Sequence, residues 1–231
     1  MLLNYQGTLH DVFTLAHEMG HALHSWYSDE HQPYIYAGYR IFVAEVASTC
    51  NEALLIHYLM EQSKKAGDRK KTMYLDNYFL EQFRTTLFRQ TMFAEFEKIT
   101  HGLQEQGETL TADRLCEIYY DLNKLYFGEE ICVDQEIAME WARIPHFYTP
   151  FYVYQYATGF SAAIAISRKI FNGEPGILEG YRKFLSGGCC DTPIELLKLA
   201  GVDMSHTGPV EEALKFFEEL LNEFEELVYR F

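Results

Sequence analysis

Apolar positions recur with helical periodicity along most of this chain. Their spacing predicts helices over residues 9–27, 41–65, 69–104, 111–126 and 209–229, a helix that Asp134 begins and Ala142 ends, a buried helix over 151–170 and a helix that ends at Leu185. Strand-like alternation is confined to Tyr34 and Tyr36, which flank an isoleucine, so a small strand is expected there. The pattern predicts a mainly α fold with at most a small β element.

The first predicted helix has the clearest start signal. Thr8 and Asp11 have the spacing of a capping box, in which each side chain bonds the backbone of the other. Apolar and small residues predict the buried stripe of this helix: Val12, Phe13, Ala16, Gly20 and Leu23. Because glycine lowers helix propensity, we expect Gly20 to mark the close approach of a neighbouring backbone.

Aromatic residues form a stripe along the predicted helix 69–104. A stripe at helical spacing is typical of a packed core rather than of a cofactor site. We therefore expect six of these residues to be core residues: Tyr78, Phe79, Phe83, Phe88, Phe93 and Phe96.

Charge and hydropathy limit the classes of partner. The chain has 34 acidic and 19 basic residues, a formal net charge of −15, which disfavours binding to nucleic acid or to an anionic membrane. No apolar run approaches the roughly 18 residues of a membrane span. We expect neither a nucleic-acid nor a membrane partner.

Length and cysteine content limit the number of domains and the compartment. The 231 residues suit one or two domains, and we expect a single domain, 1–231. The N-terminus shows no signal-peptide pattern. Five cysteines at irregular spacing do not make a disulfide framework, which predicts a cytoplasmic protein.

The candidate chemistry begins at His17-Glu18-Met19-Gly20-His21. Residues four apart lie on the same face of a helix, so His17 and His21 are able to share one metal ion. Glu18 is close enough to reach a water at that metal, as a general base does in zinc metalloproteases.

A third ligand is needed, because a catalytic zinc has three protein ligands and an open position. Glu45 is the candidate, since it is the only acidic residue in the apolar run 41–49 and ligation offsets the cost of burying it. Glu52 lies two turns later on the same face and suits a hydrogen bond to a metal-bound histidine, with a solvated surface role as the alternative. His24 is expected to be structural, because Glu45 completes the set.

The sequence resembles the oligoendopeptidase F branch of the thimet oligopeptidase family. The resemblance rests on His-Glu-x-Gly-His-x-x-His at 17–24, Phe-Val-Ala-Glu-Val-Ala-Ser-Thr at 42–49, and 150–156. It implies a zincin-like helical catalytic domain that cuts short peptides, with one Zn²⁺ on His17, His21 and Glu45, and Glu18 as base. Family members usually carry a large helical N-terminal portion, and this chain resembles their C-terminal part alone.

Peptide hydrolysis passes through a tetrahedral intermediate with a negatively charged oxygen, the oxyanion. We expect the hydrogen-bond donors that stabilise this oxyanion after residue 145. One histidine and four tyrosines surround a turn that leads into the buried helix: His146, Tyr148, Tyr152, Tyr154 and Tyr156. For any single tyrosine, packing is the better interpretation. The resemblance implies transition-state and substrate-binding roles for His146 and Tyr154, and next for Tyr152.

The sequence therefore predicts a zinc metalloendopeptidase for short unfolded peptides. Two alternatives stay open: a carboxypeptidase-type enzyme, and a zinc-binding fragment with little activity of its own. Residues that face an absent N-terminal portion would expose an apolar patch, so we expect self-association or an N-terminal partner segment. The sequence gives no account of Cys189 and Cys190.

Overall fold

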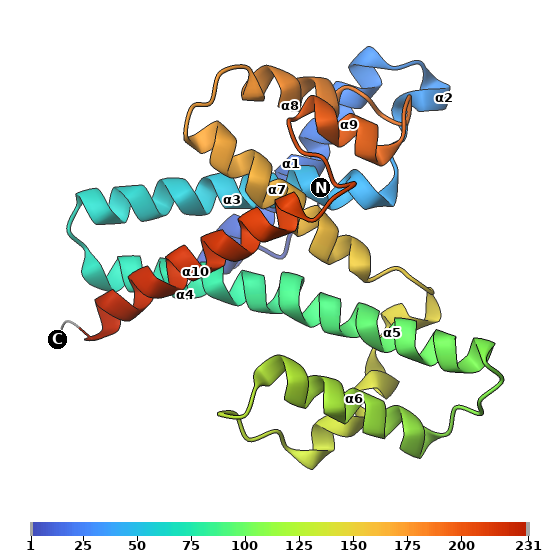
Figure 1. Ribbon diagram of the computed structural model, residues 1–231. Coiled ribbons are helices and arrows are strands. Elements are labelled where there is room, and N and C mark those ends of the chain that lie inside the picture. Colours follow the sequence, from blue (N-terminus) through green and yellow to red (C-terminus); the bar gives the residue numbers. More distant parts are fainter. Residues whose placement is uncertain (1, 230–231) are drawn as a thin grey trace. The chain divides into compact units, whose positions relative to one another are not determined.

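The computed structural model describes residues 2–229, and within them it contains helices and loops but no strand. The chain divides into two compact units, one formed by residues up to 83 and from 158 onward, the other by residues 84–157. In chain order the helical elements are α1 (Leu9–His31), α2 (Tyr34–Ala37), α3 (Ile41–Lys65), α4 (Arg69–Gln82), η1 (Phe83–Phe88), α5 (Arg89–Glu105), α6 (Ala112–Phe127), η2 (Gln135–Arg143), η3 (Pro145–Tyr148), α7 (Tyr154–Phe171), α8 (Ile177–Leu185), α9 (Pro193–Leu199) and α10 (Gly208–Tyr229) (Figure 1). The prediction of a mainly α fold is confirmed.

The start of α1 is as the sequence predicts. The Thr8 side chain accepts a hydrogen bond from the backbone of Asp11, and the Asp11 carboxylate accepts one from the backbone of Thr8. The helix runs four residues beyond the predicted end, to His31. Its buried stripe differs in the second half, because His24 and Ser28 are buried and Leu23 is 38% exposed.

The expected strand around Tyr34 and Tyr36 is wrong, because these residues form the helical turn α2. Pro33 fixes the entry to this turn, and its carbonyl accepts hydrogen bonds from the amides of Tyr36 and Ala37. The carbonyl of Tyr36 accepts a hydrogen bond of 2.8 Å from the Cys189 amide. The backbone groups that a strand would pair are thus satisfied by the turn and by a loop.

The predicted helix 69–104 is three consecutive segments. α4 ends at Gln82, the π-helical η1 follows directly, and α5 continues to Glu105. Its aromatic stripe divides between the two units: Phe79 and Phe83 are buried in the first, and Phe93 and Phe96 in the second. The core prediction is confirmed for these four.

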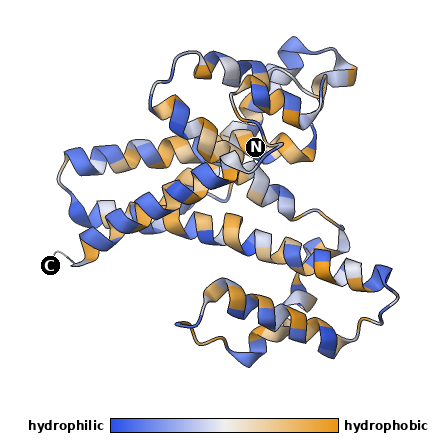
Figure 2. Ribbon diagram, viewed as in Figure 1, coloured by the Kyte–Doolittle hydropathy of each residue, from blue (hydrophilic) through white to orange (hydrophobic). Residues whose placement is uncertain are grey.

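Helix α3 forms the centre of the first unit. It has the predicted bounds, Ile41–Lys65, and it packs along α1 and α4. Small residues of α7 join the same core cluster as Val43, Val46 and Ala47. Orange and blue alternate along the helices in Figure 2, as expected of elements with one buried face.

The second unit contains most of η1, then α5, α6, η2, η3 and the first turn of α7. Its core cluster gathers Phe96 of α5, Tyr119 of α6, and Ile144 and Val153 of the later segments. The helix expected from Asp134 to Ala142 is a 3₁₀ helix, η2, without a side-chain cap at Asp134. Within residues 2–229, none of the helices combines the length and apolarity that a bilayer crossing needs.

The close approach predicted at Gly20 is present. A Cβ at Gly20 would lie 2.4 Å from the Cα of Ser48 and 2.7 Å from the carbonyl oxygen of Ala47, both on α3. No side chain fits such a gap, and the opposing atoms are backbone. Glycine at this position therefore sets the separation of α1 and α3.

We predict that Gly20→Ala lowers the free energy of unfolding by about 1–3 kcal/mol, because the added methyl group must push two helices apart. Urea denaturation measures this loss. The matched control is Gly159→Ala on α7, where a Cβ would lie 3.7 Å from the Glu45 Cβ, an ordinary contact. The control should keep or slightly raise stability, and a Gly20→Ala variant as stable as the wild type would contradict the packing argument.

Candidate metal centre

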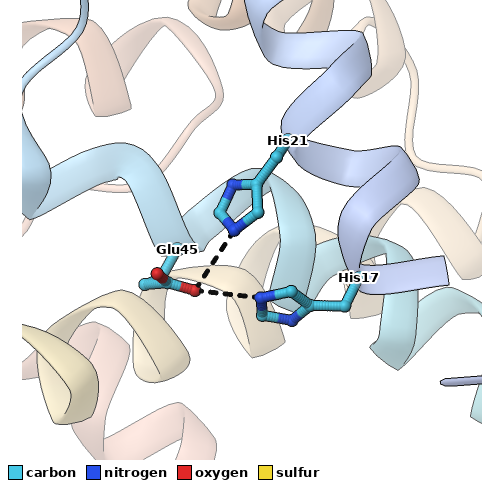
Figure 3. A group of neighbouring side chains, drawn as sticks. All are labelled: His17, His21 and Glu45. Carbon is cyan, nitrogen blue, oxygen red and sulfur yellow. Dashed lines mark ion pairs between the residues drawn. The ribbon is translucent and has the colours of Figure 1, made fainter. Parts of the chain in front are cut away.

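Two helices contribute the residues of the candidate site. His17 and His21 stand one turn apart on α1, with ring centroids 4.8 Å apart and an interplanar angle of 83°. Glu45 lies on α3, beside the point where Gly20 lets the two helices approach. Figure 3 shows both imidazoles turned toward one carboxylate oxygen of Glu45. The sequence prediction that these three residues meet agrees with this geometry.

The separations suit a tetrahedral metal ion. The Nε2 atoms of His17 and His21 lie 3.3 Å and 3.7 Å from Oε2 of Glu45. One ligand atom from each residue lies within 4.8 Å of those of the other two. Zinc–ligand bonds of about 2.0–2.2 Å at tetrahedral angles place ligand atoms roughly 3.3–3.5 Å apart. Two imidazoles and a carboxylate also form a donor set found in catalytic zinc sites.

Carboxylates and hydroxyls hold these side chains in place. His17 Nδ1 is hydrogen-bonded to Oε1 of Glu52. The second oxygen of Glu52 accepts a hydrogen bond of 3.0 Å from Nε2 of Gln82. Ser48 Oγ lies within donor distance of two Glu45 oxygens, the carbonyl oxygen at 3.0 Å and Oε2 at 3.2 Å. The expected hydrogen bond between His17 and Glu52 is therefore present. No pattern in the sequence predicted the contacts of Gln82 and Ser48.

Negative charge concentrates around His17. Burial lowers the pKa of His17, but hydrogen bonds to Glu45 and Glu52 outweigh it and raise the pKa to about 10. The hydrogen bond from His17 lowers the pKa of Glu45 in spite of its partial burial. Two carboxyl groups thus flank one imidazole, an arrangement that attracts a cation.

Glu18 follows His17 on α1 and is half-buried. Its carboxylate has no hydrogen-bond or ion-pair partner among residues 2–229. A carboxylate that directly follows a metal-binding histidine and has no such partner is available to accept a proton from water.

His24 lies outside the metal-binding group. Its ring is 1% exposed and stacks on Tyr39 with a centroid separation of 3.7 Å and an interplanar angle of 4°. Burial, with a smaller repulsion from His21, lowers the pKa of His24 to about 4. The residue is therefore neutral at pH 7 and has the structural role that the sequence suggested.

The residues expected to bind the oxyanion belong to the second unit. His146, in η3, lies parallel to the Tyr152 ring at 5.7 Å between centroids and edge-on to Tyr156 at 6.0 Å. The Tyr156 hydroxyl donates to the Tyr152 hydroxyl at 3.3 Å. Tyr154 begins α7 and is 41% exposed. The structure thus groups His146, Tyr152 and Tyr156. The sequence alone favours a packing role for Tyr156.

A strained residue, Phe151, lies between His146 and Tyr152 in the chain. Phe151 has a φ of 56°, in the left-handed region that a bulky side chain rarely adopts. Its amide donates to Oε1 of Glu97 at 2.9 Å, and Glu97 is 3% exposed. Such strain persists where surrounding contacts fix the backbone, and it is frequent at functional sites. Sequence reasoning missed both residues, because backbone strain has no periodic signature.

Gly187 and Gly188 lie in the loop after α8, and both are buried. Gly188 has a φ of 52°, and a Cβ there would lie 2.0 Å from the carbonyl oxygen of Tyr36. This loop packs tightly against α2. The structure does not explain the thiols of Cys189 and Cys190.

Known proteins resemble the chain over its whole length. The sequence profile of peptidase family M3 matches residues 1–216. The protein named Oligopeptidase PepF from Bacillus subtilis (strain 168) is 52% identical over 231 residues, 100% of this chain and 34% of that protein. Oligoendopeptidase F, chromosomal, from Lactococcus lactis subsp. cremoris is 48% identical over 99% of this chain and 37% of that protein.

Solved structures give the same result. The crystal structure of oligoendopeptidase-F from Enterococcus faecium superposes with a TM-score of 0.85 at 46% identity, over 96% of this chain and 40% of that one. The chain spans about a third of the length of the curated relatives it matches.

The low pKa of His24 predicts a pH-dependent stability. The pKa is about 4 in the folded chain, against the ordinary histidine value of 6.5 in the unfolded chain. Between these values the unfolded chain binds the proton and the folded chain does not, so stability is full above pH 6.5 and is lost as the pH falls toward 4. One such histidine should cost about 2 kcal/mol between pH 7 and pH 5.

The measurement is urea unfolding of chelator-treated protein at pH 7 and pH 5. His24→Phe keeps an aromatic ring against Tyr39 and should reduce the stability difference between the two pH values by about 2 kcal/mol. The control His10→Phe changes an exposed histidine on the same helix and should leave that difference unaltered. An unchanged difference in His24→Phe would show that the His24 ring is protonated in the folded chain.

Proposed function

Because the chain belongs to peptidase family M3, we propose that it provides the zinc centre of a metalloendopeptidase that hydrolyses short unfolded peptides. The match to family M3 and the relatives named oligoendopeptidase F confirm the resemblance stated from the sequence motifs. One observation carries the proposal: the ligand atoms of His17, His21 and Glu45 lie within 4.8 Å of one another, and the next residue on α1, Glu18, has no side-chain partner among residues 2–229.

The proposed zinc ligands are His17 Nε2, His21 Nε2 and one oxygen of Glu45, with one ion per chain. When bound, zinc supplies Lewis-acid chemistry that polarises a peptide carbonyl and acidifies water. Glu52 accepts the N–H of His17 Nδ1, which fixes the ring so that Nε2 faces the ligand group. Ser48 holds Glu45 in the same way through its hydroxyl.

Glu18 is proposed as the general base. It takes a proton from the attacking water and passes it to the leaving amine, which completes hydrolysis with no covalent intermediate on the protein. His146 and Tyr154, with Tyr152 next, are proposed as donors to the oxyanion. The parallel rings of His146 and Tyr152 support a shared role for these two residues.

The substrate proposal rests on the printed names of the relatives, oligopeptidase and oligoendopeptidase. Peptides are also the partner class that suits a chain with a net charge of −15, which disfavours nucleic acid. A cytoplasmic location is proposed because the five cysteines are all free.

Removing a ligand should abolish zinc binding. We predict about one zinc per chain in the wild type and loss of most of it in His21→Ala, because two ligands bind far more weakly than three. Metal analysis after dialysis measures the content. His10→Ala, an exposed histidine on the same helix, is the matched control and should keep its zinc. Full zinc content in His21→Ala would exclude this ligand set.

Removing the base should separate catalysis from metal binding. Glu18→Gln keeps the shape of the side chain but accepts no proton, so turnover should fall by at least ~100-fold while zinc content stays at the wild-type value. A quenched fluorescent peptide reports turnover, and chelator treatment gives the background rate. The matched control Glu30→Gln changes an exposed glutamate on α1 and should cleave at the wild-type rate. Near-normal cleavage by Glu18→Gln would assign the base to another group.

A further inference from the structure

Three helices are linked by one chain of hydrogen bonds behind the ligand group. Gln82 at the end of α4 donates from Nε2 to Oε2 of Glu52 on α3 at 3.0 Å. The other oxygen of Glu52 is bonded to Nδ1 of His17 on α1. The side chains of Glu52 and His17 are 18% and 28% exposed, so the bond between them is partly shielded from solvent.

We propose that Gln82 is a positioning residue of the zinc centre, which acts by holding the Glu52 carboxylate against the His17 ring. The inference rests on the proposed function, because it assumes that His17 is a zinc ligand. It goes beyond the proposed function by assigning a role to a residue on a third helix, which bonds Glu52.

The geometry explains why Glu52 needs a second contact. A glutamate side chain has three rotatable bonds, and ordering it costs conformational entropy. One hydrogen bond to His17 leaves the carboxylate able to turn, whereas bonds to both oxygens fix its plane. The His17 ring then has one orientation, with Nε2 directed at the other two ligands.

The chemistry of an amide suits this role. The carboxylate keeps its full charge, because Gln82 is a neutral donor. A charged acceptor at Nδ1 makes the opposite nitrogen of an imidazole a better metal ligand. A lysine or arginine at position 82 would hold Glu52 equally well. Its positive charge would, however, offset the negative charge of Glu52 that makes His17 a better metal ligand.

Helices α4 and α1 also meet one turn before Gln82. The ring of Tyr78 on α4 stacks on Phe13 of α1 with centroids 4.7 Å apart. Phe13 lies one turn before His17 on α1. The two helices are thus joined at two successive levels, an aromatic contact and the bonds through Glu52. The π-helical η1 begins at the next residue, Phe83, and π segments are frequent at functional sites.

The test is zinc affinity, measured by competition with a chromophoric chelator on the full chain. Gln82→Met keeps the length of the side chain and removes the donor. We expect its zinc dissociation constant to rise by about 10- to 100-fold, the usual effect of losing an outer-shell partner. The control Gln62→Met changes an exposed glutamine on α3 and should bind zinc like the wild type.

A double-mutant cycle shows whether Gln82 acts through Glu52. Glu52→Ala alone should weaken zinc binding, and adding Gln82→Met should weaken it no further, because the residue that Gln82 holds is already gone. The visible spectrum of the cobalt-substituted protein gives a second readout and should shift in Gln82→Met. Gln82→Leu replaces Gln82→Met if that variant fails to fold.

The outcomes separate the two levels of the argument. A wild-type chain that binds no zinc contradicts the proposed function. A wild-type chain that binds zinc, with Gln82→Met within twofold of it, leaves the proposed function intact and overturns the role of Gln82. If the increases in the zinc dissociation constant caused by Glu52→Ala and Gln82→Met multiply in the double variant, the role of Gln82 is also overturned. Gln82 would then act by a route that does not involve Glu52.

Discussion

The close contact of α1 with α3 at Gly20 determines the geometry of the candidate site. With no Cβ at this position, the α1 backbone approaches Ala47 and Ser48 of α3 directly. The same approach brings the imidazoles of α1 within 3.3 Å and 3.7 Å of the Glu45 carboxylate. A larger residue would separate the helices and spread the ligand atoms beyond the size of one coordination sphere. Helix packing and metal chemistry therefore depend on the same glycine.

The surroundings of His17 show how the fold keeps charged groups in a half-buried site. Glu45 and Glu52 lie on the same face of α3, and each contacts a different nitrogen of the ring. Each carboxylate has a further donor: Ser48 for Glu45 and Gln82 for Glu52. Hydrogen bonding of this kind offsets the cost of burial and leaves the negative charge available to a cation.

Local sequence signals predicted the parts of the structure that depend on a single helix. The bounds of α3 and the capping box of α1 were predicted, and so was the meeting of the motif histidines with Glu45; their role as zinc ligands stays a proposal. Features that depend on tertiary contacts were missed. The alternation around Tyr34 looked like a strand, but three residues of alternation also fit one helical turn. The contact of Gln82 with Glu52 joins two helices and leaves no pattern in either.

The central claim is that one zinc ion joins α1 to α3 through two imidazoles and a carboxylate. X-ray absorption at the zinc edge on the loaded chain tests it directly. The account predicts nitrogen and oxygen neighbours at about 2.0–2.2 Å, with the multiple scattering of two imidazoles and no sulfur. A sulfur neighbour at about 2.3 Å, or the signal of a single imidazole, would contradict the ligand set and the mechanism built on it.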